Sequence, residues 1–411
     1  MIKKRRFNYL FYAAIVIALL FSLLYEVFEP RSVENIAMVS GVGLEKGENE
    51  TIKLSVQIIK PTFQDTEAQG IVFTGEGSTV IEATEQIVLK TGSLLFWSHC
   101  AVMIINENLA QEDMVGHLDF FFRVLNYRNM VPIFISDKSP EEVLNSTVMF
   151  ESISAFGIQK LLEDLNQDTN SVYTNMNDFM THYYDVGGST VVAGITLAET
   201  GEGTTGQEQE SSQSENTESE ENAMVELSDC AVISKGRLAG YLNTSELMGY
   251  NWLNNDVKTR SMVIENVEFE EGVNSGTVSI AMFNLSAKIV PQQTDGKWKM
   301  RVKIKGKVEI LSVENGVDFT KKSAAEVERM TQRLNDLIQE KIQAEIESAW
   351  DKMAEYDCDF CGINKLFYSK YGNRWDGQPK TDSMDFLENV ELDYEVKFSV
   401  VTESMNKRFD D

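Results

Sequence analysis

The residues best suited to redox or metal chemistry are two cysteines late in the chain, Cys358 and Cys361, in the sequence Cys-Asp-Phe-Cys. This spacing is that of a zinc knuckle, but a closed tetrahedral site needs four ligands, and neither a second pair nor a nearby histidine follows. A redox pair is expected near a helix N-terminus, whereas this pair follows a long helical pattern. Structural thiols are the favoured interpretation, and a local disulfide or a metal site stay open as alternatives.

Imidazole chemistry is limited to His99, His117 and His182. Ser98-His99-Cys100 places nucleophile types beside a histidine, but neighbours on a strand point to opposite faces and cannot form a nucleophile and base pair. His117 lies in a helical pattern and His182 precedes two tyrosines, and the sequence identifies no chemical partner for either. Carboxylates are too numerous to single out an acid–base pair. We therefore assign no catalytic, cofactor-binding or metal-ligating residue.

Short motifs for phosphate or acyl chemistry are also missing. Gly41-Val42-Gly43 lacks the third glycine of a dinucleotide loop, because Lys46 stands at that position, and it precedes a strand pattern. The chain contains no G-x-x-x-x-G-K-[ST], G-x-S-x-G or H-E-x-x-H sequence. On residue patterns alone, the chain is a membrane-anchored extracytoplasmic protein that is not an enzyme.

The charge balance excludes one class of function. The chain has 37 Lys and Arg against 64 Asp and Glu, a formal charge of −27, and its one dense basic cluster is Lys3 to Arg6. An acidic body repels phosphate backbones, so no nucleic-acid binding is expected. The four cysteines are too few for a disulfide scaffold.

The N-terminus predicts a membrane anchor. Phe7 to Tyr25 is uncharged, and a helix of that length spans about 29 Å, close to the thickness of the hydrocarbon layer. We expect a cytoplasmic basic end at 1–6 and a single transmembrane signal anchor at 7–28, with the rest of the chain extracytoplasmic by the positive-inside rule. The alternative is a cleaved signal peptide, but its apolar region is shorter and ends in small residues.

An acidic segment interrupts the rest of the chain at 199–222. It holds eight glutamates and no basic, aromatic or large aliphatic residue, so it cannot bury enough apolar area to fold. We expect a disordered linker there, although an acidic run could also recruit cations or a basic partner. This divides the chain into an N-terminal region at 31–198 and a C-terminal domain at 223–405.

Both regions mix strand and helix patterns. The N-terminal region predicts strands at 52–58, 100–105, 131–135 and 189–196 and helices from 79, at 109–124, from 139, at 151–165 and at 174–184. The C-terminal domain predicts a hairpin at 229–242, strands at 297–308 and 390–400, and an amphipathic helix at 322–356. The fold class is therefore α/β (α+β).

The order of several short motifs resembles the Ger(x)C family of spore germination proteins, the C subunits of GerA-type nutrient germinant receptors. The N-terminal motifs are Val33 to Lys46, Gln57 to Pro61, Gly75 to Ser78 with Glu82-Ala83, and Phe96 to His99 with Val102 to Ile105. The later motifs are Ala231 to Leu242, Glu246 to Gly249, Tyr356 to Gly362, and Trp375. Together they cover nearly all of residues 33–402.

The resemblance implies a non-catalytic receptor subunit at the outer face of the spore inner membrane, assembled with A and B integral-membrane subunits. It also implies three mixed α/β domains, so that 31–198 could hold two subdomains, and we expect largely antiparallel sheets. It implies no cofactor. A membrane-anchored envelope enzyme and an extracytoplasmic adaptor remain the alternatives.

One departure from the family concerns the anchor. Family members are usually lipoproteins with a lipidated N-terminal cysteine, but the first cysteine here is Cys100. We expect the 7–28 helix to replace the lipid.

Overall fold

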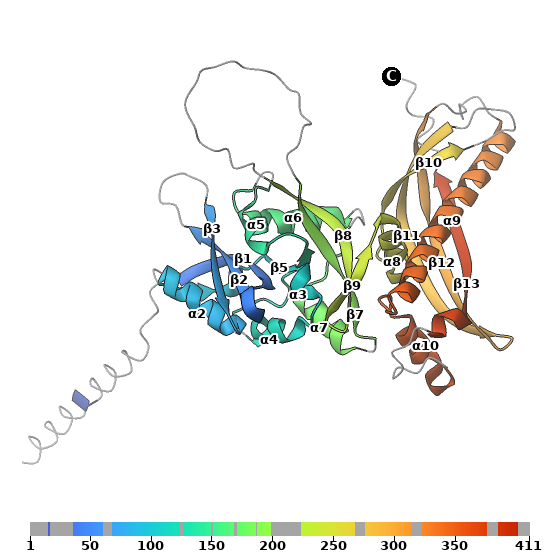
Figure 1. Ribbon diagram of the computed structural model, residues 1–411. Helices are drawn as coiled ribbons and strands as arrows, with labels where there is room; N and C mark the ends of the chain where they lie inside the picture. Colours follow the sequence, from blue (N-terminus) through green and yellow to red (C-terminus); the bar gives the residue numbers. More distant parts are fainter. Residues whose placement is uncertain are drawn as a thin grey trace, which may run out of the picture.

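The structure is a computed structural model, and its described residues are 15–16, 36–60, 68–123, 126–148, 151–167, 171–185, 187–198, 223–267, 276–314, 323–375 and 385–401. Within them, two β-sheets and their helices form two adjoining bodies (Figure 1). The N-terminal body contains the first sheet, and the C-terminal body contains the second. Both are mixed α/β structures, as the residue patterns predict.

The first sheet has nine strands in the order β3-β2-β1-β5-β6-β7-β8-β9, with β4 paired to β1. Its centre is parallel, because β1, β5, β6 and β7 run in one direction, while the outer strands pair antiparallel. The strands are β1 (Ile36–Lys46), β2 (Ile52–Lys60), β3 (Gln69–Gly77), β4 (Leu94–Phe96), β5 (Val102–Asn106), β6 (Ile133–Ser136), β7 (Ser189–Ala198), β8 (Met224–Ser234) and β9 (Arg237–Leu242).

Helices cover both faces of this sheet. One face packs against α2 (Val80–Thr91), α4 (Val115–Arg123) and α7 (Met176–Tyr184) in one hydrophobic core. The other face packs against α5 (Pro140–Asn145) and α6 (Ser154–Gln167) in a second core. The short α3 (Glu107–Ala110) follows β5. The central strands are therefore buried on both sides, which explains their continuous apolar sequences.

The strands on either side of the acidic segment are neighbours in the first sheet. β7 and β8 pair antiparallel over their whole length, from Ser189 with Ser234 to Ala198 with Met224. The segment 199–222 itself lies outside the described residues, but it connects two paired strands of one sheet. The division between the sheets comes after Leu242, where β9 ends, and therefore differs from the predicted division at 199–222.

The second sheet has four strands in the order β10-β11-β12-β13. The strands are β10 (Arg260–Val267), β11 (Gly276–Thr294), β12 (Lys297–Glu314) and β13 (Val390–Val401). The helices α8 (Thr244–Asn254), α9 (Ala324–Glu355) and α10 (Ile363–Tyr371) contribute to the core that buries one face of the sheet (Figure 1). On the other face, basic side chains of β12 form ion pairs with acidic side chains of β13.

Helix boundaries confirm most of the predictions. Thr79 caps α2 by accepting a hydrogen bond from the Glu82 amide at 3.2 Å, and the long C-terminal helix is α9. The helix predicted at 109–124 is wrong, because the chain forms α3 and α4 instead. α3 ends at Ala110, and Asp113 marks the start of α4, since its side chain accepts a hydrogen bond from the Val115 amide at 3.1 Å.

The predicted anchor at 7–28 and the basic end at 1–6 lie outside the described residues, apart from Ile15 and Val16. Among the helices that the structure describes, none has the length and apolar character needed to cross a bilayer. The described residues form two sheets, and a division into three domains stays a prediction.

Candidate functional site

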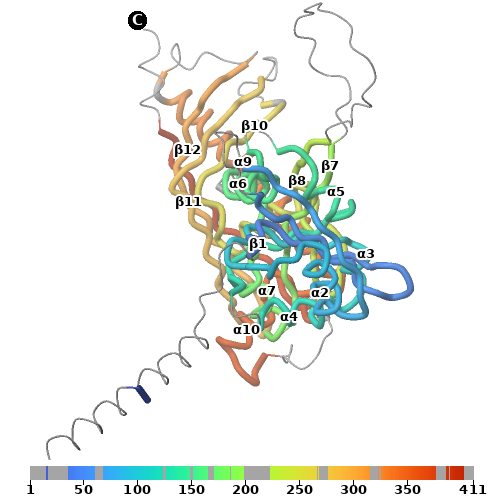
Figure 2. The backbone as a smooth tube through the Cα atoms, turned by 90° about the vertical axis from the view of Figure 1, so that its left-hand side faces the viewer, coloured from blue at the N-terminus to red at the C-terminus, as the bar shows by residue number. Residues whose placement is uncertain are grey.

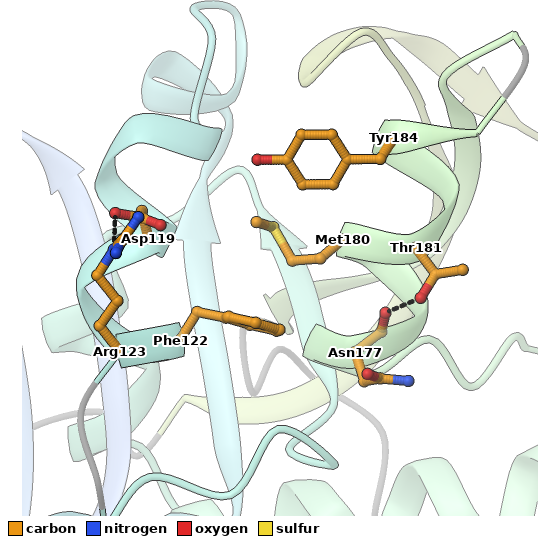
Figure 3. Close-up of a pocket in the computed structure, with 7 residues that line it drawn as sticks. All are labelled: Asp119, Phe122, Arg123, Asn177, Met180, Thr181 and Tyr184. Carbon is orange, nitrogen blue, oxygen red and sulfur yellow. Dashed lines mark hydrogen bonds and ion pairs between the residues drawn. The ribbon is translucent and has the colours of Figure 1, made fainter.

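A surface pocket of about 440 Å³ lies between α4 and α7 (Figure 3). Phe122 of α4 points toward α7, and Met180 and Tyr184 of α7 complete the apolar part of its lining. Phe122 is 40% exposed and Tyr184 is 75% exposed, while Met180 is buried. Two large aromatic side chains therefore present apolar surface to solvent beside a hollow.

The polar groups around this pocket bond mainly within their own helices. The Arg123 guanidinium donates to the Asp119 carboxylate at 2.6 Å, and this partner raises the pKa of Arg123. The Thr181 hydroxyl donates to the Asn177 carbonyl at 2.7 Å. Phe122, Met180 and Tyr184 give the pocket an apolar lining that would suit an apolar group.

A second pocket, of about 250 Å³, lies at the carboxyl ends of β5 and β6. It is lined by Glu107 and Asp137, which follow these two strands, and by Asp229 of β8 and Tyr241 of β9. The Tyr241 hydroxyl donates to Glu107 at 2.9 Å, and burial together with this carboxylate raises the pKa of Tyr241. Carboxyl ends of parallel strands are common ligand sites in open sheets, and this one would suit a cationic group.

A third hollow follows the open edge of the second sheet. It lies between β10 and α9, where the Lys341 ammonium donates to the Val263 carbonyl at 3.1 Å. An edge strand offers unpaired backbone groups to a further strand from a partner. This hollow is a possible docking surface by geometry alone.

The cysteine pair lies where the two bodies meet. Cys358 is buried, and the hydroxyls of Ser189 and Ser234 in the first sheet act to lower the pKa of its thiol, against the larger effect of burial. Burial raises the pKa of both Cys358 and Cys361. Both thiols are free in the structure, and the structural-thiol interpretation stays a prediction.

The residues around the cysteine pair hold the two bodies together. The Tyr356 hydroxyl donates to the Tyr241 carbonyl of β9 at 2.8 Å, and Lys365 of α10 forms an ion pair with Asp185. Asp359 is buried and accepts from the amides of Ile363 and Asn364 at 2.8 and 2.7 Å. We call residues 356–365 the seam segment, because they attach the C-terminal body to the first sheet.

Desolvation dominates the electrostatics of the seam segment. It raises the pKa of Asp359 to about 6, although the three backbone amides at the start of α10 act in the opposite direction. Asp359, between the two cysteines, therefore supplies the carboxylate that accepts from the first amides of α10, whose N-cap residue is Gly362.

The structure separates the three histidines. His99 lies on a short 3-10 helix beside Phe96, and His182 lies 3.3 Å from the Thr190 hydroxyl. His117 is half-buried, and desolvation lowers its pKa. Within the described ranges, no group of three His, Cys, Asp or Glu side chains is placed to hold a metal ion.

None of the pocket residues was singled out from the sequence. The α4 and α7 residues are some sixty positions apart, and the run Phe120-Phe121-Phe122 is the only local signal. In a helix, three consecutive aromatics cannot all face the core. Phe121 is buried and Phe122 is exposed, so this run could have indicated a surface aromatic.

The comparisons with known proteins identify the class of protein. Residues 29–197 match the family described as "Spore germination protein N-terminal domain". Residues 228–403 match the family described as "Spore germination B3/ GerAC like, C-terminal". The two matches follow each other in order and cover most of the chain, so the chain belongs to the Ger(x)C family of spore germination proteins.

A curated relative is "Spore germination protein KC" of Bacillus subtilis (strain 168), which is 22% identical over 381 residues, 89% of each chain. A solved structure, "Crystal Structure of the GerBC protein", has a TM-score of 0.49 and 13% identity, with 88% of this chain and 97% of that chain covered. Family membership supports a role in spore germination.

Proposed function

We propose that this chain is the non-catalytic C subunit of a nutrient germinant receptor and acts through protein–protein contacts at the outer face of the spore inner membrane. Its partners are the A and B integral-membrane subunits, and the anchor at 7–28 holds it in the membrane with its body outside. The order and extent of the two family matches, at 29–197 and 228–403, carry the proposal.

The geometry is compatible with a connecting subunit. The seam segment links the two bodies through a hydrogen bond from Tyr356, buried contacts of Cys358 and the ion pair of Lys365. These contacts run from the end of α9, the following loop and α10 to the first sheet and to Asp185 at the end of α7. A partner bound to one body would therefore be held at a fixed position relative to the other.

Deletion of the gene in the sporulating host tests the proposal. Spores should lose their response to nutrients and keep their response to a trigger that does not need receptors. Counting phase-dark spores after each treatment measures both. If a strain that lacks the other receptors still germinates without this gene, the proposal is wrong.

Point variants separate the receptor function from the envelope-enzyme alternative. Glu107 and Asp137 line the pocket at the carboxyl ends of β5 and β6, which we call the acidic pocket. They are its carboxylates to test for acid–base chemistry. Complementation with Glu107→Gln and Asp137→Asn should restore nutrient germination in a receptor subunit. Loss of germination with normal protein levels in both variants would favour the enzyme. An adaptor that acts outside the receptor would fail to co-purify with the A and B subunits.

A further inference from the structure

Of the eight large apolar side chains that are exposed in the described part of the N-terminal body, five lie along one edge, and the other three are Ile71, Ile81 and Met224. β1, β4, β5, β6 and β7 are parallel, so their amino ends share this edge. Five of the large apolar side chains that are more than a third exposed lie in the segments leading into β4, β6 and β7. We call these five residues the amino-edge rim: Leu89, Leu94, Phe122, Met130 and Tyr184.

Three members of the amino-edge rim are more than half exposed to solvent. Leu89 in the last turn of α2 is 84% exposed, Tyr184 at the end of α7 is 75% exposed and Met130 is 62% exposed. Figures 1 and 2 place α2, α4 and α7 along the same lower side of the N-terminal body. Phe122 and Tyr184 line the same pocket, and exposed apolar side chains that gather on one side of a protein often mark an interaction surface.

The chain enters the body at this same edge. Ile36, the first residue of β1, pairs with Leu94 of the rim, and paired strands lie about 4.8 Å apart. Residues 29–35 are the only positions between the predicted anchor and β1. Seven residues reach at most about 25 Å even when fully extended. The rim is therefore within a short tether of the place where the anchor leaves the hydrocarbon layer.

We propose that the amino-edge rim rests on the lipid bilayer, with Leu89 and its apolar neighbours inserted among the headgroups. This inference rests on the proposed membrane anchor and adds the orientation of the body to it. Aromatic side chains such as Tyr184 and Phe122 suit the interface between water and hydrocarbon. Arg123 and Arg128 are exposed on the same segments and can approach lipid phosphates, although Asp119 neutralises Arg123.

The short segment 29–35 between the predicted anchor and β1 favours the bilayer, over a partner protein, as the surface that the rim contacts. A protein partner could contact any face of the body, whereas a short tether limits which face can lie on the membrane. The amino-edge rim lies on the edge where the chain enters the N-terminal body. An exposed apolar residue elsewhere in the molecule serves as the contrast. Val263 of β10 is also exposed, at 50%, but β10 belongs to the C-terminal body, away from β1 (Figure 1).

Lipid quenching of a fluorescent label tests the orientation. The full chain with Leu89→Cys, labelled with nitrobenzoxadiazole, is reconstituted in nanodiscs of phosphatidylcholine and phosphatidylglycerol, with or without doxyl-labelled lipid. The matched control is Val263→Cys, and the unsubstituted chain gives the background from native thiols, three of which are buried. Both positions are exposed, so neither substitution disturbs a core.

We expect a several-fold larger loss of fluorescence from doxyl lipid at position 89 than at position 263, together with a blue-shifted emission at 89. Equal quenching at both positions would overturn the inference. So would a label at position 89 that stays in water in the nanodisc and becomes protected only when the A and B subunits are added, because the rim would then bind protein.

The same sample distinguishes failure of the anchor from failure of the orientation. If the chain does not co-elute with the nanodisc, the proposed anchor is wrong and the inference falls with it. If the chain co-elutes but Leu89→Cys is not quenched, the anchor stands and only the orientation is wrong. Adding Leu89→Glu and Leu94→Glu should also reduce quenching of a label at Met130→Cys, since charge disfavours insertion.

Discussion

The two bodies bury their sheets in different ways. Helices cover both faces of the first sheet, whereas the second sheet has helices on one face and ion pairs on the other. Arg301 of β12 and Asp393 of β13, for example, pair across the wet face at 2.6 Å. In a sheet with one solvated face, apolar and polar residues alternate along each strand, and this alternation shows which face is buried. Strands that are buried on both faces lack this alternation. The alternating pattern predicted β12 and β13 of the second sheet, whereas β5 and β6 of the first sheet were predicted from continuous apolar runs.

The two bodies also differ in the charge of their buried polar networks. In the N-terminal body, Gln57 accepts from the Ser40 hydroxyl at 2.9 Å and donates to the Leu144 carbonyl at 2.7 Å, so the network is neutral. In the C-terminal body, Arg260 forms a two-pronged ion pair with Glu345 at 2.6 and 2.7 Å. The Trp252 indole also donates to Glu345 at 3.1 Å. A buried charge is costlier to leave unpaired than a buried amide.

The largest expected effect is in the ionic network. Glu345→Ala leaves Arg260, of which only 12% of the side chain is exposed, without its partner. It also removes the acceptor of the Trp252 indole. We expect the free energy of unfolding to fall by about 3–5 kcal/mol. Urea unfolding of the detergent-solubilised chain, followed by tryptophan fluorescence, measures this loss.

A double variant provides the control. Arg260→Met with Glu345→Leu removes both charges together, so its loss should be clearly smaller than that of Glu345→Ala. If Glu345→Ala alone costs less than about 1 kcal/mol, the ion pair contributes little and the distinction between the two bodies fails.

A smaller effect is expected in the neutral network. Gln57→Leu keeps the apolar contacts but leaves the Ala155 amide without the acceptor that it bonds at 3.2 Å. It also leaves the Ser40 hydroxyl without its closer acceptor. We expect a loss of about 2 kcal/mol, since each unpaired buried group costs about 1–3 kcal/mol. The same urea titration measures it.

Gln332→Leu on α9 is the matched control, because Gln332 is exposed and donates to Asp336 of the same helix at 3.0 Å. Its stability should change little. If Gln57→Leu lowers the free energy of unfolding as much as Glu345→Ala does, the charge of the Arg260–Glu345 network does not explain the larger effect expected there.

The fold was predictable both where one face of an element is exposed to solvent and where a short strand is buried on both faces, as in β5 and β6. The strands at 297–308 and 390–400 and the helix at 322–356 followed from their apolar period, and the structure confirms them as parts of β12, β13 and α9. The pairing of β7 with β8 could not be predicted, because strand partners depend on contacts between segments that are distant in sequence. The acidic segment marks a composition change, and composition does not show which strands are neighbours.

The candidate sites were less predictable than the fold. The apolar pocket needs Phe122 and Tyr184 from helices that only tertiary packing brings together. The acidic pocket needs the carboxyl ends of β5 and β6, and no sequence pattern separates Glu107 and Asp137 from the other carboxylates. The cysteine motif was noticed for its thiols, while the structure gives the clearest electrostatic role to Asp359 between them.

The smallest effect on stability is expected from the seam segment between the bodies, and this effect depends on pH. The folded-state pKa of Asp359 is raised to about 6 from an ordinary value of 3.8, mainly because the carboxyl is buried. A raised carboxyl pKa means that the folded state binds the proton more tightly than the unfolded state. The resulting stabilisation is fully present below the unfolded pKa and is lost as the pH rises through about 6. Between pH 7 and pH 5, the chain should gain about 1 kcal/mol from this group.

Asp359→Asn isolates this contribution, because it removes the titrating group while the other carboxylates remain in both chains. Glu391 and Glu395 have lowered pKa values from their lysine partners and change stability in the opposite direction as the pH falls, but they cancel in the comparison. The stability of the native chain relative to the variant, from urea titrations at pH 7 and pH 5, should therefore rise on acidification. An unchanged difference would mean that Asp359 does not titrate in this range, and the buried acid of the seam would then behave like the neutral network around Gln57.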